Sequence, residues 1–455
     1  MFRRVAIIGG GAAAATLLSE LLERESSQPL QLDWFTGGGR PVRGVAYGTA
    51  SGRHLLNVRA ASMSMFAGKP RGFLDFVQRD DPAINGTDFL PRRRYGDYLE
   101  AEVERALQRA KVHGHHVNII PFAVDALVPE QNGITVIHGE ESLPADAAVL
   151  ALGALPPRPL AGVSTAALDS GHYVVDPWRL LANLDELPTP PRKVVLIGLG
   201  LTAVDMLLEL SAQWPQTEFV AVSRHGLFPE AHLHAAAAPA DDGAELVGAM
   251  RDAPEIRHWM RLLREAIGQE GTEWRAVVDS LRPNLPGLWA ELSIEQRSRF
   301  LRHARWAWER VRHRMPPQVH EAISALEHSG RLHRQRGRVR SVDVAGAGLQ
   351  LQVERAGKSW LLDADMVIQT VGLDTDVRRS SHRLISQLLT NAHIVSDPFG
   401  LGVQANPDGQ LQHDGAYWPN LFAIGSLLRG TLWESTAMPE IRQQARHLAD
   451  RLLSD

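Results

Sequence analysis

The chain contains no cysteine among its 455 residues. This absence excludes disulfide bonds, thiolate metal ligands and redox chemistry by a pair of thiols. Excess charge of one sign is also missing, because the formal net charge is −4 and the isoelectric point is near 6.6. The overall charge therefore does not favour a nucleic-acid partner. No apolar stretch is long enough and free enough of charge to span a membrane, so we expect a cytoplasmic protein without membrane attachment.

The first glycine motif begins at Gly9 and reads G-x-G-x-x-A. It follows an apolar strand over 5–8 and begins a helix over 12–22, which is the local context that dinucleotide binding requires. Gly9 permits the tight turn, Gly11 lets the backbone approach a pyrophosphate, and Ala14 allows close packing of helix on strand. The positive end of the helix favours the phosphates. The motif therefore predicts dinucleotide binding.

One expected element of this first motif is missing. An acidic residue that holds a ribose hydroxyl normally ends the second strand. Here the strand ends at Thr36, and Asp33 lies one face too early. We expect Thr36 to take the position of the acid.

The second motif, Gly198 to Ala203, has the same pattern and also lies between a strand and a helix. Gly198, Gly200, Thr202 and Ala203 are its expected cofactor-binding residues. The next strand ends in a Ser-Arg pair, Ser223 and Arg224, with no acid. That pair suits a 2′-phosphate and favours NADPH over NADH.

Two such motifs far apart in one chain indicate an α/β protein with two Rossmann-like domains. The arrangement resembles that of flavoproteins with two dinucleotide-binding domains, which implies that the first domain binds FAD and the second binds NADPH or NADH. We expect a discontinuous FAD domain over 1–185 and 372–455, and an NADPH domain over 186–371. A mainly helical insertion, rich in Trp and Arg, is expected over 244–329 and is a candidate lid. Its Arg-rich part, 297–314, is typical of the solvated face of an amphipathic helix; attraction of an anionic substrate is the alternative.

Longer strings carry a family resemblance. They are Arg43–Thr49 (RGVAYGT), His54–Val58 (HLLNV), Ser223–Leu227 (SRHGL), Leu421–Ser426 (LFAIGS) and Gly430–Ala437 (GTLWESTA). Together they resemble the bacterial FAD/NAD(P)-binding proteins of the YdhS-like family, which is similar to class B flavin monooxygenases and amino-acid N-hydroxylases. Ser426 stands where the flavoprotein motif usually has an Asp that bonds the ribityl chain.

The resemblance implies where the flavin would bind. Asn57 would lie near the flavin ring, and Trp433 and Glu434 would line the flavin site, so these three are the candidate catalytic residues. The remaining expected FAD contacts are Arg43, Tyr47, Leu56, Val58, Gly153, Gly425, Ser426 and Thr436. The alternatives are a turn residue at 57, a packed Trp at 433, and a Glu at 434 favoured by the positive end of a helix.

The function follows from the cofactors and from the missing thiols. NADPH would reduce FAD, and without a pair of cysteines the simplest remaining acceptor is dioxygen. We expect a monooxygenase of a small polar substrate. Urate, oxidised to 5-hydroxyisourate in purine breakdown, is the best single substrate because one protein of this family is a urate hydroxylase. The alternatives are an amino-acid or amine N-hydroxylase and a non-catalytic FAD/NADPH-binding protein. The histidine pairs lack carboxylates at metal spacing, so no metal site is expected.

Overall fold

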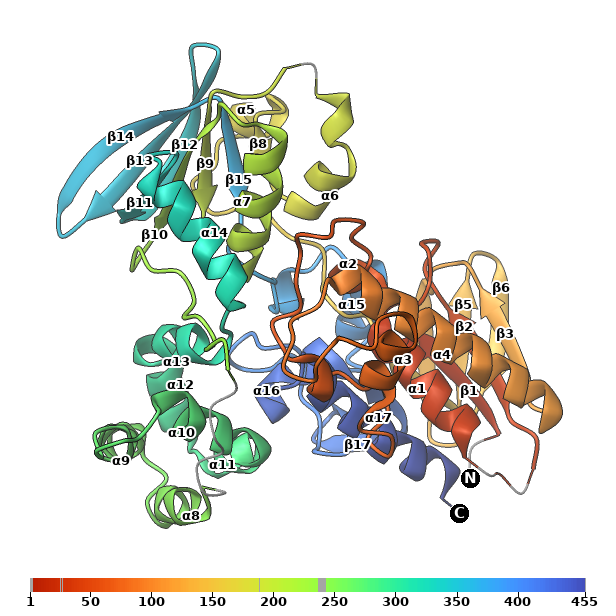
Figure 1. Cartoon of the computed structure of the whole chain (residues 1–455). Coiled ribbons are helices and arrows are strands. Elements are labelled where there is room, and N and C mark those ends of the chain that lie inside the picture. The colour runs from red at the N-terminus through yellow and green to blue at the C-terminus, as the bar shows by residue number, and fades with distance from the viewer. Residues whose placement is uncertain (1–2, 25, 27, 188, 236–242, 455) are drawn as a thin grey trace.

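Two α/β units and one helical unit make up the molecule (Figure 1). The computed structural model describes residues 3–24, 26, 28–187, 189–235 and 243–454. This arrangement confirms the predicted fold class of two Rossmann-like domains with a helical insertion. No helix among the described residues is long and apolar enough to cross a membrane.

The first unit is built on a six-stranded sheet to which both ends of the chain contribute. Its order is β16 (Gln410–His413), β17 (Ala416–Ala423), β7 (Ala147–Leu150), β1 (Arg4–Ile8), β2 (Gln31–Phe35) and β3 (His116–Ile120). All neighbours pair in parallel except β16 and β17. The central strands are almost wholly apolar because both faces of a parallel sheet are covered.

Helices cover one face of this sheet and a small antiparallel sheet covers the other. Three long helices, α1 (Ala12–Glu23), α4 (Arg92–Val112) and α17 (Met438–Leu453), bury their apolar faces with those of β1 and β2. The opposite face packs on β4 (Ala126–Glu130), β5 (Gly133–His138), β6 (Glu141–Ala145) and α15 (Arg383–Thr390). Shorter helices complete the unit: α2 (Gly44–Tyr47), α3 (Gly72–Asp80) and α16 (Arg429–Leu432).

The second unit repeats this plan. Its parallel sheet has the order β11 (Leu332–Arg336), β10 (Glu218–Ser223), β9 (Lys193–Ile197), β15 (Met366–Gln369) and β8 (Tyr173–Val174). One face packs on α7 (Leu201–Gln213), α14 (Pro317–His328) and α6 (Pro177–Ala182). The other packs on α5 (Thr165–Asp169), β12 (Arg338–Ala345), β13 (Gly348–Arg355) and β14 (Lys358–Ala364).

The boundary between the two units differs from the predicted one at residue 186. Strand β8 pairs with β15 in the second sheet, and Ser164 N already donates to Val342 O at 3.0 Å. The second unit therefore includes residues from about 164 onwards. A two-residue strand has no periodicity from which sequence could assign it to a sheet.

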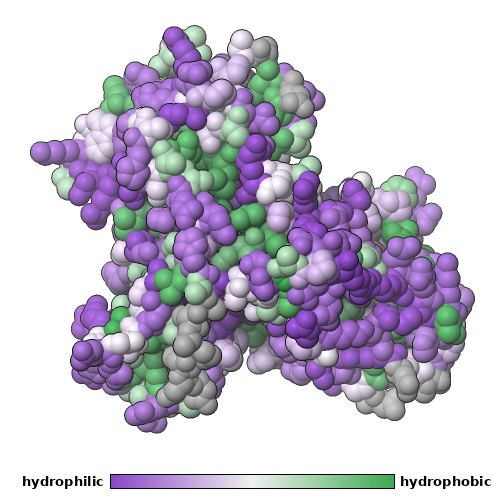
Figure 2. Space-filling view, viewed as in Figure 1, coloured by the Kyte–Doolittle hydropathy of each residue, from purple (hydrophilic) through white to green (hydrophobic). Residues whose placement is uncertain are grey.

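Six helices form the insertion: α8 (Ala244–Asp252), α9 (Ile256–Ile267), α10 (Trp274–Ser280), α11 (Leu285–Glu291), α12 (Ile294–His303) and α13 (Arg305–Arg312). They enclose their own apolar core and lie against the first unit near α16 (Figure 1). The face shown in Figure 2 is largely hydrophilic, and hydrophobic side chains are visible in the middle of that face, where the units meet.

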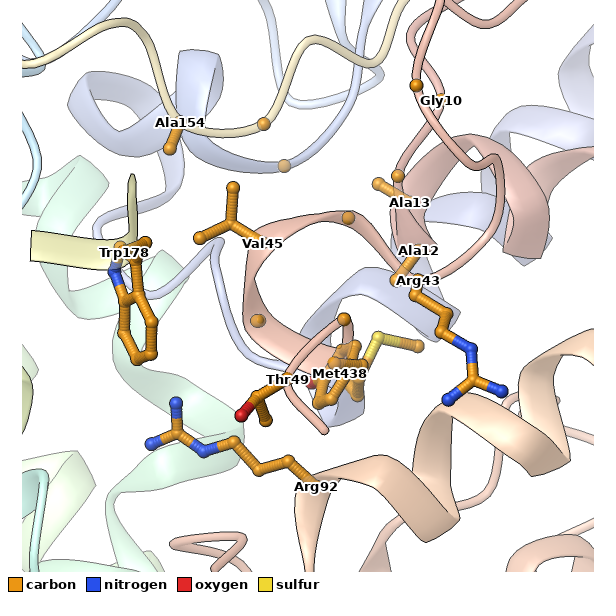
Figure 3. A pocket seen from close by; sticks show the side chains of 18 of the residues that line it. Gly10, Ala12, Ala13, Arg43, Val45, Thr49, Arg92, Ala154, Trp178 and Met438 are labelled. Carbon is orange, nitrogen blue, oxygen red and sulfur yellow. The ribbon is translucent and has the colours of Figure 1, made fainter. Parts of the chain in front are cut away.

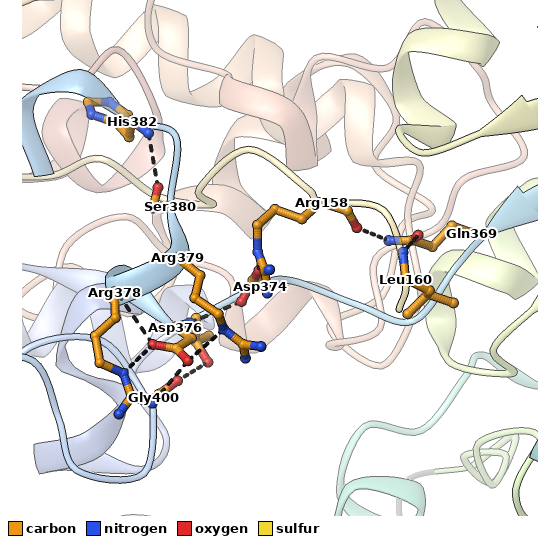
Figure 4. A network of polar contacts seen from close by, with 11 residues as sticks. Arg158, Leu160, Gln369, Asp374, Asp376, Arg378, Arg379, Ser380, His382 and Gly400 are labelled. Carbon is orange, nitrogen blue, oxygen red and sulfur yellow. Dashed lines mark hydrogen bonds and ion pairs between the residues drawn. The ribbon is translucent and has the colours of Figure 1, made fainter. Parts of the chain in front are cut away.

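The two chain connections between the α/β units run side by side and are joined by polar contacts (Figure 4). Gln369 accepts from Leu160 N at 3.1 Å and donates to Arg158 O at 2.8 Å. Arg158 also pairs with Asp374. The Pro-rich stretch that begins at 156 is thus one of two linked crossovers.

Candidate functional site

The first turn contains three glycines, Gly9, Gly10 and Gly11, and they are needed for different reasons. A Cβ on Gly9 would lie 2.2 Å from Ala151 O, and one on Gly10 would lie 2.5 Å from Thr36 O. Gly9 also has a φ of +131, which favours glycine. The fold itself requires these two glycines. A Cβ on Gly11 would come no closer than 3.9 Å to a described atom, so the fold does not require a glycine here. The missing side chain instead leaves open space beside the turn.

That space is a cavity of about 1440 Å³, larger than the roughly 300–1,000 Å³ of small-molecule pockets in general. Figure 3 shows Ala12 and Ala13 at one end and Trp178 and Arg92 at the other. Nine predicted residues line it: Gly11, Thr36, Arg43, Tyr47, Gly153, Thr202, Gly425, Ser426 and Thr436. Because Thr202 belongs to the second motif, a single cavity borders both glycine motifs.

The wall of the cavity fits a dinucleotide. A Cβ on Gly153 would meet no described atom within 4 Å, and one on Gly425 would meet only Ala13 Cβ at 3.8 Å. With Gly11, these residues follow the carboxyl ends of β1, β7 and β17, and all three line the cavity. That edge of a parallel sheet is where such ligands bind, and a helix N-terminus attracts phosphate.

Several polar groups at the cavity are already engaged. Arg43 donates through Nε to Glu100 at 2.8 Å and through Nη2 to Asp97 and Glu100 at 2.6 Å, and these bonds raise its pKa further. Ser426 Oγ donates to Gly153 O. Thr36 is buried at the end of β2. These side chains therefore shape the wall of the cavity.

The second turn matches the first in its geometry. Gly198 has a φ of +114, and a Cβ there would lie 2.4 Å from Thr370 O. A Cβ on Gly200 would meet no described atom within 4 Å, and Ala203 is fully buried against the sheet.

Basic side chains gather at the end of β10, where Ser223 and Arg224 lie. Ser223 Oγ accepts from Gly226 N at 3.0 Å, and Arg224 is exposed. Arg336 is the register partner of Ser223 on β11. Burial, then the charges of Arg224 and Arg336, lower the pKa of His225. Sequence reasoning missed Arg336, because only the pairing of β10 with β11 brings it there.

A buried ion pair joins the two α/β units at the cavity and was also missed. Arg92, at the start of α4, lies 2.9 Å from Asp205 Oδ2 on α7, with the side chains 14% and 7% exposed. His54 is fully buried beside them and its Nε2 lies 3.3 Å from Asp205 O. Burial raises the pKa of Asp205, and the charge of Arg92 opposes that effect. The sequence signal was an acidic residue in the most apolar stretch of the chain.

The residues predicted around Asn57 do not line this cavity. Leu56 is buried and its N donates to Leu90 O at 2.8 Å. Val58 packs against the core of the first unit. Asn57 O accepts a hydrogen bond from His232 Nε2 at 3.2 Å, so Asn57 faces the chain that leads into the insertion.

Trp433 and Glu434 also lie outside the cavity, in contact with the insertion. The Trp433 ring stacks on Trp289 with centroids 4.8 Å apart. Glu434 is 6% exposed and accepts from Trp308 Nε1 at 3.2 Å. Both side chains are therefore packed between α16 and the helical unit, as in the alternative that sequence left open for Trp433.

Comparison with known proteins supports this description. Residues 6–155 match a family described as FAD-NAD(P)-binding. No match was found among curated protein sequences. The ornithine N-hydroxylase of Kutzneria sp. 744 is similar in structure, with a TM-score of 0.68, 17% identity and 99% of each chain covered. L-lysine 6-monooxygenase of Pseudomonas syringae has a TM-score of 0.67 and 16% identity, again over 99% of each chain. The cadaverine monooxygenase of Erwinia amylovora has a TM-score of 0.63 and 12% identity, over 99% of this chain and 94% of that one. The chain shares the fold of these flavoproteins.

Proposed function

We propose that this chain is a FAD-dependent, NAD(P)H-consuming monooxygenase of a small polar substrate. The observation that carries the proposal is the single cavity bordered by both glycine motifs. Gly11, Gly153 and Gly425 would hold FAD, while Gly200 and Thr202 with Ser223 and Arg224 would hold NADPH. A cofactor in each position would bring the two reacting rings together between the α/β units.

When bound, FAD would accept a hydride from NADPH and then react with dioxygen. The residues of this chain would bind and orient both cofactors and exclude water. Arg92 and Asp205 would hold the two units together where the cofactors meet. The chain has no cysteine, so it cannot pass electrons to a dithiol of its own.

An amine or amino acid is the substrate class that we place first. The proteins of similar fold are named for ornithine, lysine and cadaverine, which favours N-hydroxylation over the oxidation of urate. Urate remains the second candidate, because the strings at 43–49 and 430–437 resemble a family with a urate hydroxylase. Asn57, Trp433 and Glu434 remain predicted catalytic residues near the flavin, although none of the three lines the cavity.

The test begins with the purified protein and its flavin absorbance. NADPH and oxygen consumption are then followed with L-ornithine, L-lysine, L-aspartate, cadaverine and urate, with hydroxylated product measured in each case. We expect one of these substrates to accelerate NADPH oxidation and to be hydroxylated. Failure to bind FAD on reconstitution would refute the assignment of the first motif. FAD binding without substrate-dependent NADPH oxidation or product would favour a non-catalytic FAD/NADPH-binding protein.

A further inference from the structure

Four arginines lie together where the insertion meets the first unit. This arginine cluster consists of Arg282, Arg312, Arg314 and Arg442. Arg312 is 7% exposed and Arg314 is 2% exposed, which is unusual for a side chain that stays charged. Burial is the main cause that lowers the pKa values of Arg312, Arg314 and Arg442, and the charge of a neighbouring arginine also lowers each of them, which marks these residues as neighbours. The pKa of Arg282 is raised instead, because its bonds to Glu440 outweigh the effect of burial.

The carboxylates near the cluster neutralise it incompletely. Arg282 binds Glu440 through two hydrogen bonds of 2.5 and 2.9 Å. Arg312 Nη2 lies 3.8 Å from Glu434 and 3.7 Å from Glu440, too far for a hydrogen bond. Asp279 pairs with Arg314 but its side chain is 50% exposed. Four guanidinium groups thus face three carboxylates, one of them at the surface.

Several buried N–H groups of the cluster have no acceptor among the described residues. They are Arg312 Nε and Nη2, Arg314 Nε and Nη1, and Arg442 Nε. A buried donor of a charged group left without an acceptor is costly, and a fold keeps one only when something else satisfies it. Acceptor oxygens that carry negative charge would match five unpaired donors on three cations best, because charge-assisted hydrogen bonds are the strongest.

Three described neighbours of the cluster do not supply those oxygens. Burial, then the charge of Arg314, lower the pKa of His232 to about 3, so this imidazole is neutral near pH 7. Arg275 is a further cation, and it pairs with Glu273. Arg59 donates to the carbonyls of Thr87 and Leu233.

The cluster lies close to the proposed cofactor cavity along the chain. Thr436, Met438 and Ile441 line the cavity. Glu434 and Glu440, from the same segment of chain, approach Arg312. An acid bound at Arg312 and Arg314 would therefore lie one chain segment away from the cavity.

We propose that Arg312 and Arg314 bind an acidic group of the substrate, a carboxylate or the urate anion. The inference rests on the proposed function and restricts its substrate class. Amino acids and urate carry a group that satisfies the unpaired guanidinium donors, whereas a diamine does not. Cadaverine, a substrate of one protein of similar fold, is therefore excluded here.

Binding to the FAD-loaded protein without NADPH tests this inference separately from catalysis. Calorimetric titrations would use L-ornithine, L-lysine, L-aspartate, urate and cadaverine. We expect at least one of the acids to bind and cadaverine not to bind. Arg314→Gln should weaken acid binding roughly tenfold or more, since a hydrogen bond to a charged group is lost. Arg302→Gln is the matched control, because Arg302 is an exposed arginine of the same insertion, and it should change affinity less than twofold.

Arg314→Met tests the same point through stability. Asp279 is half exposed and stays solvated when Arg314 is removed, so this variant should unfold at an equal or higher temperature than wild type without ligand. It should also lose the rise in unfolding temperature that a bound acid gives wild type. Equal binding of cadaverine and ornithine, no binding of any acid to wild type, or unchanged acid binding by Arg314→Gln would each overturn the inference. NADPH oxidation with cadaverine but no acid binding would overturn it while leaving the monooxygenase proposal intact.

Discussion

Of the residues of the first motif, Gly11 is the one whose replacement should best distinguish an effect on cofactor binding from an effect on folding. A Cβ at this position would come no closer than 3.9 Å to a described atom, and the backbone already has the extended φ of −95 that alanine accepts. We predict that Gly11→Ala folds normally and binds FAD poorly, because the methyl group fills the space into which the pyrophosphate must come.

The magnitudes follow from the position of Gly11 as the N-cap of α1. Replacing a flexible glycine stabilises by about 0.4–1 kcal/mol through the unfolded chain. Alanine is a poorer N-cap than glycine, at a cost of roughly 1 kcal/mol. The two effects nearly cancel, so the unfolding temperature of the apo-protein should move by no more than about 2–4 °C. Loss of one hydrogen bond to a charged phosphate costs about 1.5–3 kcal/mol, which weakens FAD binding roughly 10- to 100-fold.

The assay is flavin titration of the apo-protein, with thermal unfolding measured alongside. Gly200→Ala is the matched control: Gly200 is the N-cap of α7, and its Cβ would also enter open space. That variant should keep its affinity for FAD and raise the KM for NADPH by the same factor. FAD affinity of Gly11→Ala equal to that of wild type would refute the reasoning, as would a loss of fold.

Three further predictions concern polar groups. Joint replacement of Arg224 and Arg336 by Ser should raise the KM for NADPH roughly tenfold or more and leave that for NADH nearly unchanged, measured by steady-state kinetics. Arg92→Leu leaves Asp205 buried without its cation, so urea unfolding should show a loss of about 3–5 kcal/mol. His232 has a pKa near 3 in the fold against 6.5 unperturbed, so its contribution to stability is complete above pH 6.5 and is lost as the pH falls toward 3. In that window His232→Gln should lessen the pH dependence of the unfolding free energy by up to about 1.4 kcal/mol per pH unit.

Each of these variants has a control. Arg338→Ser removes an exposed charge next to β11 and should leave the KM for NADPH unchanged. Arg94 lies 4.0 Å from the exposed Asp80, so Arg94→Leu should cost only roughly 0–1 kcal/mol. For His232→Gln the control is the range above pH 6.5, where the pH dependence of the unfolding free energy should match that of wild type. Equal effects of a variant and its control would contradict the corresponding prediction.

Features that depend on neighbours in sequence were predictable. The turns at Gly9 and Gly198 combine an apolar strand, a backbone that only glycine tolerates, and a helix, and all three are encoded within about a dozen residues. The helical insertion was likewise predictable from its sequence, and one of its helices, α12, has a local cap in which Gln296 N donates to Ser293 Oγ at 3.3 Å.

The residues predicted from the family resemblance do not all lie at the cavity. Thr436 lines the cavity, but Trp433, three residues earlier, packs on Trp289 of the insertion. A sequence string shared with a family indicates which residues occur together in a fold. It does not indicate which side of a short segment faces a ligand and which side faces another unit. That choice depends on how the insertion docks.

By itself the sequence determined the two cofactor turns, the α/β class, the helical insertion and the absence of thiol chemistry. Each of these depends on local backbone conformation or on composition. Tertiary structure alone decided that one cavity borders both turns, that Arg336 stands beside Ser223, and that Arg92 meets Asp205. It also brought Arg312 and Arg314 into a buried cluster, although their segment is typical of a solvated helix face. These outcomes follow from long-range packing, in which burial rather than local sequence sets the chemistry of a side chain.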